Sequence, residues 1–219
     1  MFIMKLKPEF FDQVKSGKKI YEVRIYDEKS YILVKANSTD ITNIIIPDKY
    51  NGFPVTEIED SAFKDCILLK NVVIPNSILK IGSESFYCCE SLESIIVPDS
   101  VIYIGEAAFD RCKSLNNIVL GKNLTILENV LFGICTSLKN IVIPNGIKTI
   151  EESVFFACQN LQSVTIPNTI TSIKDGAFFY CISLKDVYFL GSKKEWEQIV
   201  IGPFNGNLTE ANIHYIDNE

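Results

Sequence analysis

Three side chains recur along most of this sequence at a fixed interval of 23 residues. They form the motif F-x-x-C-x-x-L, which occurs six times without a break in register. The members are Phe63, Phe86, Phe109, Phe132, Phe155 and Phe178; Cys66, Cys89, Cys112, Cys135, Cys158 and Cys181; and Leu69, Leu92, Leu115, Leu138, Leu161 and Leu184. One unit of this length cannot bury its own apolar residues, whereas stacked copies bury them against one another. The period therefore predicts a solenoid of stacked coils.

Six of the seven cysteines occupy one position of this repeat. A position that is the same in every coil is a packing position, so we expect a column of buried free thiols that act as small apolar side chains. Neighbouring coils lie about 4.8 Å apart, so a disulfide between adjacent thiols is the alternative. A reducing compartment would keep the thiols apart. The spacing matches no zinc-binding motif.

The path of one coil can be predicted from residues 92–112. Ile95 and Val97 alternate with Ile96, so the first two point inward and Ile96 points outward from a short strand. After a turn the chain re-enters the core and reaches Phe109. The first unit is longer than the others, and Asn51-Gly52 marks an inserted turn there.

The pattern L-x-x-I-x-I-P-x-x-V-x-x-I-G-x-x-A-F-x-x-C over residues 44–186 resembles the BspA-like subfamily of leucine-rich repeats. The resemblance implies a strand-rich α/β repeat solenoid: a right-handed superhelix of about six 23-residue repeats with N- and C-terminal caps. Members of this family are often found on microbial surfaces, where they serve adhesion and protein recognition. The resemblance therefore implies a bacterial protein-recognition or adhesion module.

Residues 187–219 are similar to the C-terminal cap of such arrays. Ser192 and Glu195 have the spacing of a helix capping box. We expect Trp196, Ile199 and Val200 to share one face of the helix that follows, with Trp196 as a lid on the last coil. Residues 211–216 are expected to add a final strand.

Residues 1–28 lie outside the repeat and resemble the beginning of an ASCH domain. The match carries that family's G-x-K-x-x-E-x-R motif as Gly17, Lys19, Glu22 and Arg24. The resemblance implies an RNA- or nucleotide-linked role, which is the alternative function for this chain. The purely structural interpretation is an N-terminal cap on the first coil, because solenoids need polar terminal caps. Residues 29–43 are expected to be a connecting strand.

Charge and motifs narrow the class of function. The formal net charge is −6, so no bulk basic field attracts nucleic acid. The beginning MFIMKLKPEFF does not have the pattern of a secretory signal, which predicts a cytoplasmic protein, although the family resemblance leaves the cell surface open. No apolar stretch reaches the length of about 20 residues that spans a bilayer, so no membrane insertion is expected. We find no catalytic constellation, metal-ligand spacing or cofactor motif, and we expect a non-enzyme without cofactors.

The remaining candidates are surfaces. The outward residue in the middle of each strand should stack into a row of β-branched side chains, edged by Asn and Ser. The row consists of Ile45, Val73, Ile96, Val119, Val142, Thr165 and Tyr188. Strand propensity alone explains the same residue types, so this alternative stays open. The expected partner is a protein or a second copy of the chain.

A second, less regular surface follows the repeat phenylalanine. Phe156 and Phe179 are expected to lie one coil apart, with Tyr180 beside the latter. Aromatic residues are favoured anchors at interfaces, and packing against a neighbouring turn is the alternative.

Overall fold

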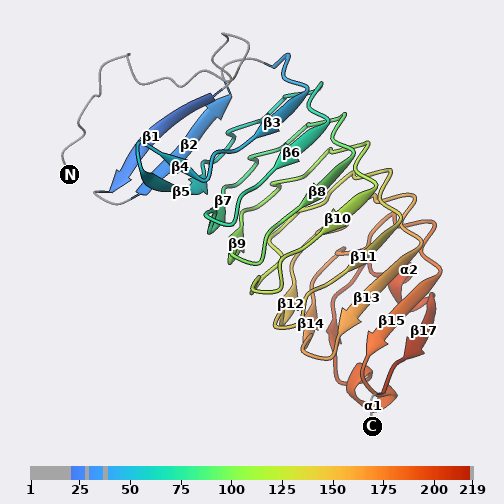
Figure 1. The fold of residues 1–219 in the computed structure, drawn as a ribbon. Coiled ribbons are helices and arrows are strands. Elements are labelled where there is room, and N and C mark those ends of the chain that lie inside the picture. The colour runs from blue at the N-terminus through green and yellow to red at the C-terminus, as the bar shows by residue number, and fades with distance from the viewer. Residues whose placement is uncertain (1–20, 28–29, 37–38, 218–219) are drawn as a thin grey trace.

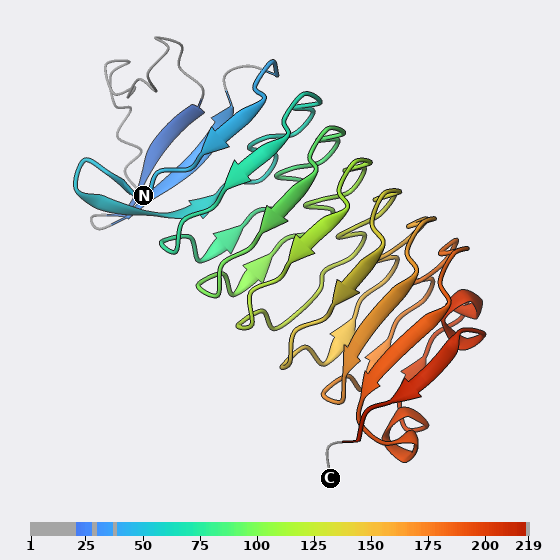
Figure 2. The same ribbon diagram turned by 45° about the vertical axis from the view of Figure 1, so that its right-hand side comes forward.

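The computed structural model describes residues 21–27, 30–36 and 39–217. These residues form an elongated solenoid in which short strands stack coil upon coil from one end of the molecule to the other (Figure 1). The two strand stacks run along opposite sides of the coils, and a column of tight turns joins them (Figure 2). Helix is confined, in the described residues, to two four-residue segments near the C-terminus. The strand-rich solenoid is therefore confirmed.

The first stack, which we call the strand face, consists of parallel strands with one strand in each coil. It has eight strands rather than six, because β3 precedes the strict period and β17 comes from the C-terminal cap. The residues in register repeat the period, for example Asn117 with Ser94 and Ser163 with Asp186. The strands are β3 (Asn43–Ile45), β6 (Asn71–Val73), β8 (Ser94–Ile96), β10 (Asn117–Val119), β11 (Asn140–Val142), β13 (Ser163–Pro167), β15 (Asp186–Leu190) and β17 (Asn212–Tyr215).

The second stack forms the back of the solenoid. It begins with an antiparallel hairpin, β1–β2, whose second strand pairs in parallel with β5. The hairpin closes the N-terminal edge of the back sheet. The strands are β1 (Tyr21–Asp27), β2 (Ser30–Ala36), β4 (Lys49–Tyr50), β5 (Phe53–Ile58), β7 (Lys80–Ile81), β9 (Tyr103–Ile104), β12 (Thr149–Ile150), β14 (Ser172–Ile173) and β16 (Val200–Ile201).

The inserted turn of the first unit is confirmed. Asn51 and Gly52 both have positive φ, 48° and 85°, and they join β4 to β5 as an antiparallel hairpin. Two positive φ values are what a tight two-residue hairpin requires, and Asn-Gly is the preferred pair for it.

The core is a ladder of repeat side chains. All six repeat phenylalanines have 0% exposure, and successive rings lie stacked with centroids 5.0–5.8 Å apart. The cysteines are free and buried, as predicted, apart from half-buried Cys88, which lies outside the column. From Cys89 onward each column thiol donates to the carbonyl oxygen of the phenylalanine one coil earlier, at 3.1–3.3 Å. The column therefore provides hydrogen bonds between coils as well as apolar packing.

The turns that carry this ladder have an unusual backbone. Residues of positive φ stand two positions before and two positions after each repeat phenylalanine, including the β-branched Val130 and Ile134. Such residues are rare outliers in this region of φ. Their N–H groups donate to carbonyls of the next coil, Val130 to Glu152 at 3.0 Å and Ile134 to Phe156 at 2.7 Å. Pairing between coils therefore holds a conformation that these side chains disfavour.

The C-terminal cap agrees with the sequence in part. Helix α1 (Lys193–Trp196) starts at the predicted capping box of Ser192 and Glu195, and Trp196 packs edge-to-face on Phe189 at 5.3 Å. The predicted position of Val200 is wrong. It begins β16 and is 69% exposed, because the helix ends after one turn and Val200 pairs with Ser172 instead.

One residue of the cap was not recognised from the sequence. Asn205 precedes α2 (Gly206–Thr209) and is only 3% exposed. Its Oδ1 accepts from the Phe178 N–H at 3.0 Å, and its Nδ2 donates to the carbonyls of Lys174 and Gly202 at 2.8 and 2.9 Å. This side chain therefore supplies the pairing that another coil would give.

Candidate protein-interaction surface

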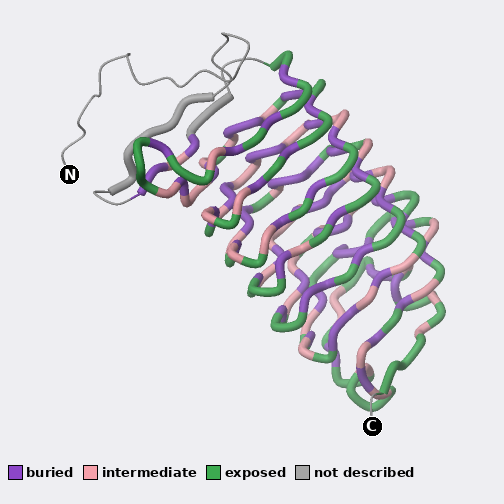
Figure 3. The backbone as a smooth tube through the Cα atoms, viewed as in Figure 1, coloured by how far each residue is buried: buried purple, intermediate pink, exposed green. Residues whose placement is uncertain are grey.

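The strand face carries a row of exposed apolar side chains. In β3, β6, β8, β10 and β11 the last residue of each strand points outward while the residue before it is buried, which Figure 3 shows as alternating colours along the tube. The outward residues are between 50% and 71% exposed. We call them the strand-face ridge: Ile45, Val73, Ile96, Val119 and Val142.

The row changes character toward the C-terminus. Thr165 is only half-buried and Tyr188 is 36% exposed, so the predicted row does not continue as an apolar ridge. His214 extends the row, because β17 aligns it with Tyr188, and the two rings stack with centroids 4.8 Å apart. Its Nε2 lies 2.8 Å from Asp186 Oδ1, and this hydrogen bond lowers the pKa of the aspartate. The expected final strand could have placed His214 here.

A polar column borders the ridge, two residues earlier in each strand. The side chains pair along the solenoid: Asn71 Nδ2 donates to Asn43 Oδ1 at 2.7 Å, and Ser163 Oγ donates to Asn140 Oδ1 at 2.8 Å. These exposed contacts orient the amides across the face. The ridge thus has an apolar centre and a hydrogen-bonding border, which is the usual anatomy of a protein interface.

The strand face is interrupted once. Strands β10 and β11 are neighbours, but they belong to separate sheets, and the back strands are also divided, between β9 and β12, where Leu127 bridges to Ile150 only. The interruption follows Gly121, where a Cβ atom would lie 2.4 Å from the carbonyl oxygen of Pro98. Only glycine allows this close approach to the preceding coil. We call the gap between β10 and β11 the seam.

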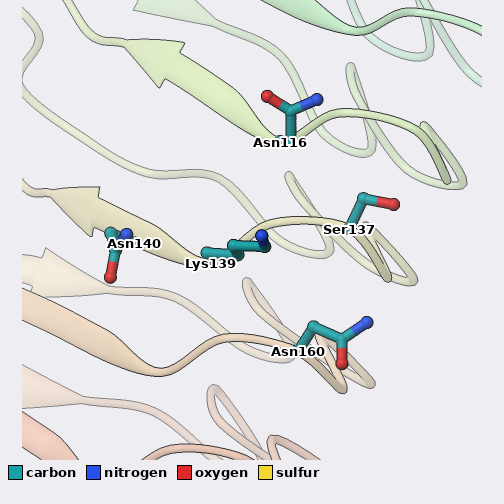
Figure 4. A pocket seen from close by; sticks show the side chains of 5 residues that line it. All are labelled: Asn116, Ser137, Lys139, Asn140 and Asn160. Carbon is teal, nitrogen blue, oxygen red and sulfur yellow. The ribbon is translucent and has the colours of Figure 1, made fainter.

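A polar pocket of about 350 Å³ opens beside the seam. It is lined by residues that precede or begin the strands of three successive coils, as Figure 4 shows. The lining residues are Asn116, Ser137, Lys139, Asn140 and Asn160. Sequence reasoning did not find this pocket; the only signal was the glycine that replaces the usual proline at position 121.

The second predicted surface is an aromatic cluster on the turns near the C-terminus. Phe179 lies 4.6 Å from Tyr180 and 6.1 Å from Phe156, centroid to centroid. Phe179 and Phe156 are tilted by 34°. Phe179 and Tyr180 are exposed, Phe156 is half-buried, and Phe204 from the cap joins the cluster at 5.8 Å and is 68% exposed. The structure brings these residues together, and whether they bind a partner stays a prediction.

The turn after Phe109, two or more coils before the aromatic cluster, holds a buried carboxyl group. Asp110 is 7% exposed, and its Oδ1 has no hydrogen-bond partner in the described part of the chain. It occupies the space that a side chain at Gly133 would take, since a Cβ there would lie 2.6 Å from Oδ1. Burial raises the pKa of Asp110 to about 6, although Arg111 Nε lies 3.7 Å from Oδ2 and favours the charged form. Desolvation therefore outweighs the neighbouring cation.

The motif assigned to RNA binding lies at the border of the described structure. Gly17 and Lys19 fall outside the described residues, and Glu22 and Arg24 belong to β1. The RNA-linked role therefore stays a prediction. Within the described ranges, no group of three or more His, Cys, Asp or Glu residues could hold a metal ion. No helix in the same ranges is long and apolar enough to cross a membrane.

Stacked parallel strands, a repeat of 23 residues and a continuous phenylalanine ladder define a leucine-rich repeat solenoid. A family model described as "BspA type Leucine rich repeat region" matches six copies in residues 34–133 and 79–205. The chain belongs to this BspA-type leucine-rich repeat family.

One solved structure agrees with this fold. A leucine-rich repeat protein of T. pallidum, TpLRR, has a TM-score of 0.76 and 24% identity, and the match covers 92% of this chain and 98% of that one. A leucine-rich cell surface protein of Faecalibacterium prausnitzii has a TM-score of 0.49 and 16% identity, with coverage of 86% and 98%. A comparison with curated proteins found no match.

Proposed function

We propose that this chain is a non-catalytic recognition module that binds a protein partner through the strand-face ridge. The observation that carries the proposal is the row of five β-branched side chains, each at least half exposed, on stacked parallel strands. Large exposed apolar patches rimmed by polar residues mark contact sites. Strand propensity explains the same residue types and is the alternative that the test must distinguish from a contact site.

The test compares two faces of the same solenoid. Ile96, Val119 and Val142 are replaced together by Asp, and a matched control carries Leu79→Asp and Ile102→Asp, which are exposed apolar residues at the other side of the coils. Both proteins are used to capture partners from the source cells, with mass spectrometry as the readout. Partners lost with the ridge variant and kept with the control support the proposal. Equal capture by both variants, with folding intact, contradicts it.

We propose a reducing compartment for this protein. None of the seven cysteines forms a disulfide, and column thiols from Cys89 onward are used as hydrogen-bond donors between coils. The predicted cytoplasmic location fits this, and the surface description belongs to the F. prausnitzii protein. Fractionation of the source cells, followed with an antibody against the chain, distinguishes the cytoplasm from the cell surface. Recovery from the cell surface contradicts the reducing compartment.

A further inference from the structure

At the seam, a main-chain bond that other coils of the strand face form is missing from the described structure. At the position just before each strand, the N–H donates to the preceding coil: Asn116 to Glu93, Gln162 to Lys139 and Lys185 to Gln162, at 2.7–3.1 Å. The corresponding bond from Lys139 N–H to the carbonyl oxygen of Asn116 does not occur. A donor and an acceptor of the backbone are therefore left for water or a ligand at the pocket.

Two side-chain amides around this gap already have acceptors: Asn116 Nδ2 donates to the Ser114 carbonyl at 3.4 Å, and Asn160 Nδ2 donates to the Thr136 carbonyl at 2.7 Å. Asn140 Oδ1 is occupied by Ser163 Oγ, which leaves its Nδ2 group for a ligand. The Lys139 side chain lies between those of Asn116 and Asn160 (Figure 4), and it forms no ion pair with any described residue. Lys139 and Asn140, which both line the pocket, thus supply a cation, a side-chain amide N–H group and a main-chain N–H as donors.

The charge of the pocket differs from that of the molecule. The chain carries a formal charge of −6, yet the pocket lining contains a lysine and no acidic residue. It also contains no aromatic or aliphatic side chain that would form an apolar wall. A carboxylate satisfies this donor set, since it accepts charge-assisted hydrogen bonds on two oxygens.

The position of the pocket indicates what carries that carboxylate. Asn140 and Val142 are two residues apart in β11 and therefore lie on the same face of the strand. The ridge residues Val119 and Val142 flank the seam and are 50% and 63% exposed. A partner that covers the ridge there brings its own side chains to the pocket.

We propose that the seam pocket binds the carboxylate of an aspartate or glutamate side chain of a protein partner seated on the strand-face ridge. Lys139 Nζ neutralises the carboxylate, and Asn140 Nδ2 and the Lys139 N–H orient it. The apolar ridge supplies contact area, and the pocket fixes the register of the partner along a face that otherwise repeats every coil. This inference rests on the proposed function for the partner.

The test uses a small probe and does not need the partner. The labelled protein is titrated with N-acetyl-glutamate N-methylamide and, separately, with the glutamine analogue, and amide shifts are followed by NMR. The glutamate probe is expected to shift the side-chain amides of Asn116 and Asn140 and the main-chain amide of Lys139. The glutamine analogue is expected to leave them in place.

The repeat supplies a matched control for the lysine. Lys185 occupies the same coil position two coils later and is exposed. Lys139→Met should lower the affinity for the glutamate probe by about tenfold or more, whereas Lys185→Met should not change this affinity. Equal shifts with both probes, equal loss in both variants, or no shift at the pocket overturns the proposal.

The two proposals fail separately. If the glutamate probe does not shift the pocket but the Asp substitutions on the ridge still abolish capture, the pocket inference alone is wrong. If the probe binds but the ridge variant captures the same partners as the control variant, the proposed function is wrong. The carboxylate site then has no partner surface beside it.

Discussion

The phenylalanine ladder and the strand-face ridge follow the same 23-residue period but differ in what the period preserves. The ladder keeps one residue type in six coils and excludes solvent completely. The ridge keeps only β-branched character in five coils, leaves each side chain at least half exposed, and then changes to Thr165, Tyr188 and His214. The buried column therefore specifies stacking, and the exposed column is where binding can be specific.

Removing one ring from the ladder should give the largest effect. Phe109→Ala leaves a cavity between stacked neighbours at 5.4 and 5.8 Å and should lower the free energy of unfolding by about 3–5 kcal/mol. Val119→Ala, on the ridge of the same coil, should change it by about 0.5 kcal/mol or less. Urea unfolding followed by circular dichroism measures both. Similar losses would mean that the ridge also carries stability.

A substitution in the C-terminal cap should give the next largest loss of stability. Asn205→Ala removes the acceptor of the buried Phe178 N–H and the donor to two part-buried carbonyls, which should cost about 1–3 kcal/mol. Asn207→Ala, two residues away, serves as the control. Hydrogen exchange should accelerate in the last coils while the first coils stay protected. Uniform acceleration would show that the cap stabilises the whole stack instead of its end.

The buried carboxyl group gives a pH-dependent effect. The pKa of Asp110 is raised to about 6 from a usual value near 3.8, so the folded state holds a proton that the unfolded state has released. Stability from this group is therefore fully present below about pH 3.8 and declines as the pH rises to about 6, by up to about 3 kcal/mol. Asp110→Asn should flatten this decline in unfolding experiments between pH 4 and 7. An unchanged profile would mean that the carboxyl group is solvated.

The smallest effect concerns the thiols. Burial raises the pKa of Cys66 to about 11 and of Cys181 to about 12, whereas Cys88 is only half-buried. A thiol reagent should therefore modify one cysteine quickly in the native protein and the other six only on unfolding. Cys88→Ser should remove the fast phase. Fast modification of several column cysteines would contradict the buried ladder.

The sequence predicts what a local pattern determines and misses what depends on the approach of one coil to another. The Phe, Cys and Leu positions, the inserted Asn51-Gly52 turn and the capping box of Ser192 are properties of a local pattern, and all are confirmed. The length of helix α1, the capping contacts of Asn205 and the seam depend on how close one coil approaches another. Gly121 was visible as a departure from the period, but its consequence requires the position of Pro98 in space. The same holds for Val130 and Ile134, whose positive φ no propensity predicts.

The central claim is that recognition takes place on the strand face and not on the aromatic cluster of the turns. Hydrogen exchange of the chain with its captured partner tests this most directly, read by mass spectrometry on peptides from each side of the coils. We predict slower exchange in residues 71–73, 94–96, 117–119 and 139–142, and unchanged exchange around Phe179, Tyr180 and Phe204. Protection confined to residues 176–182 and 203–206, with the strands unaffected, would contradict the account.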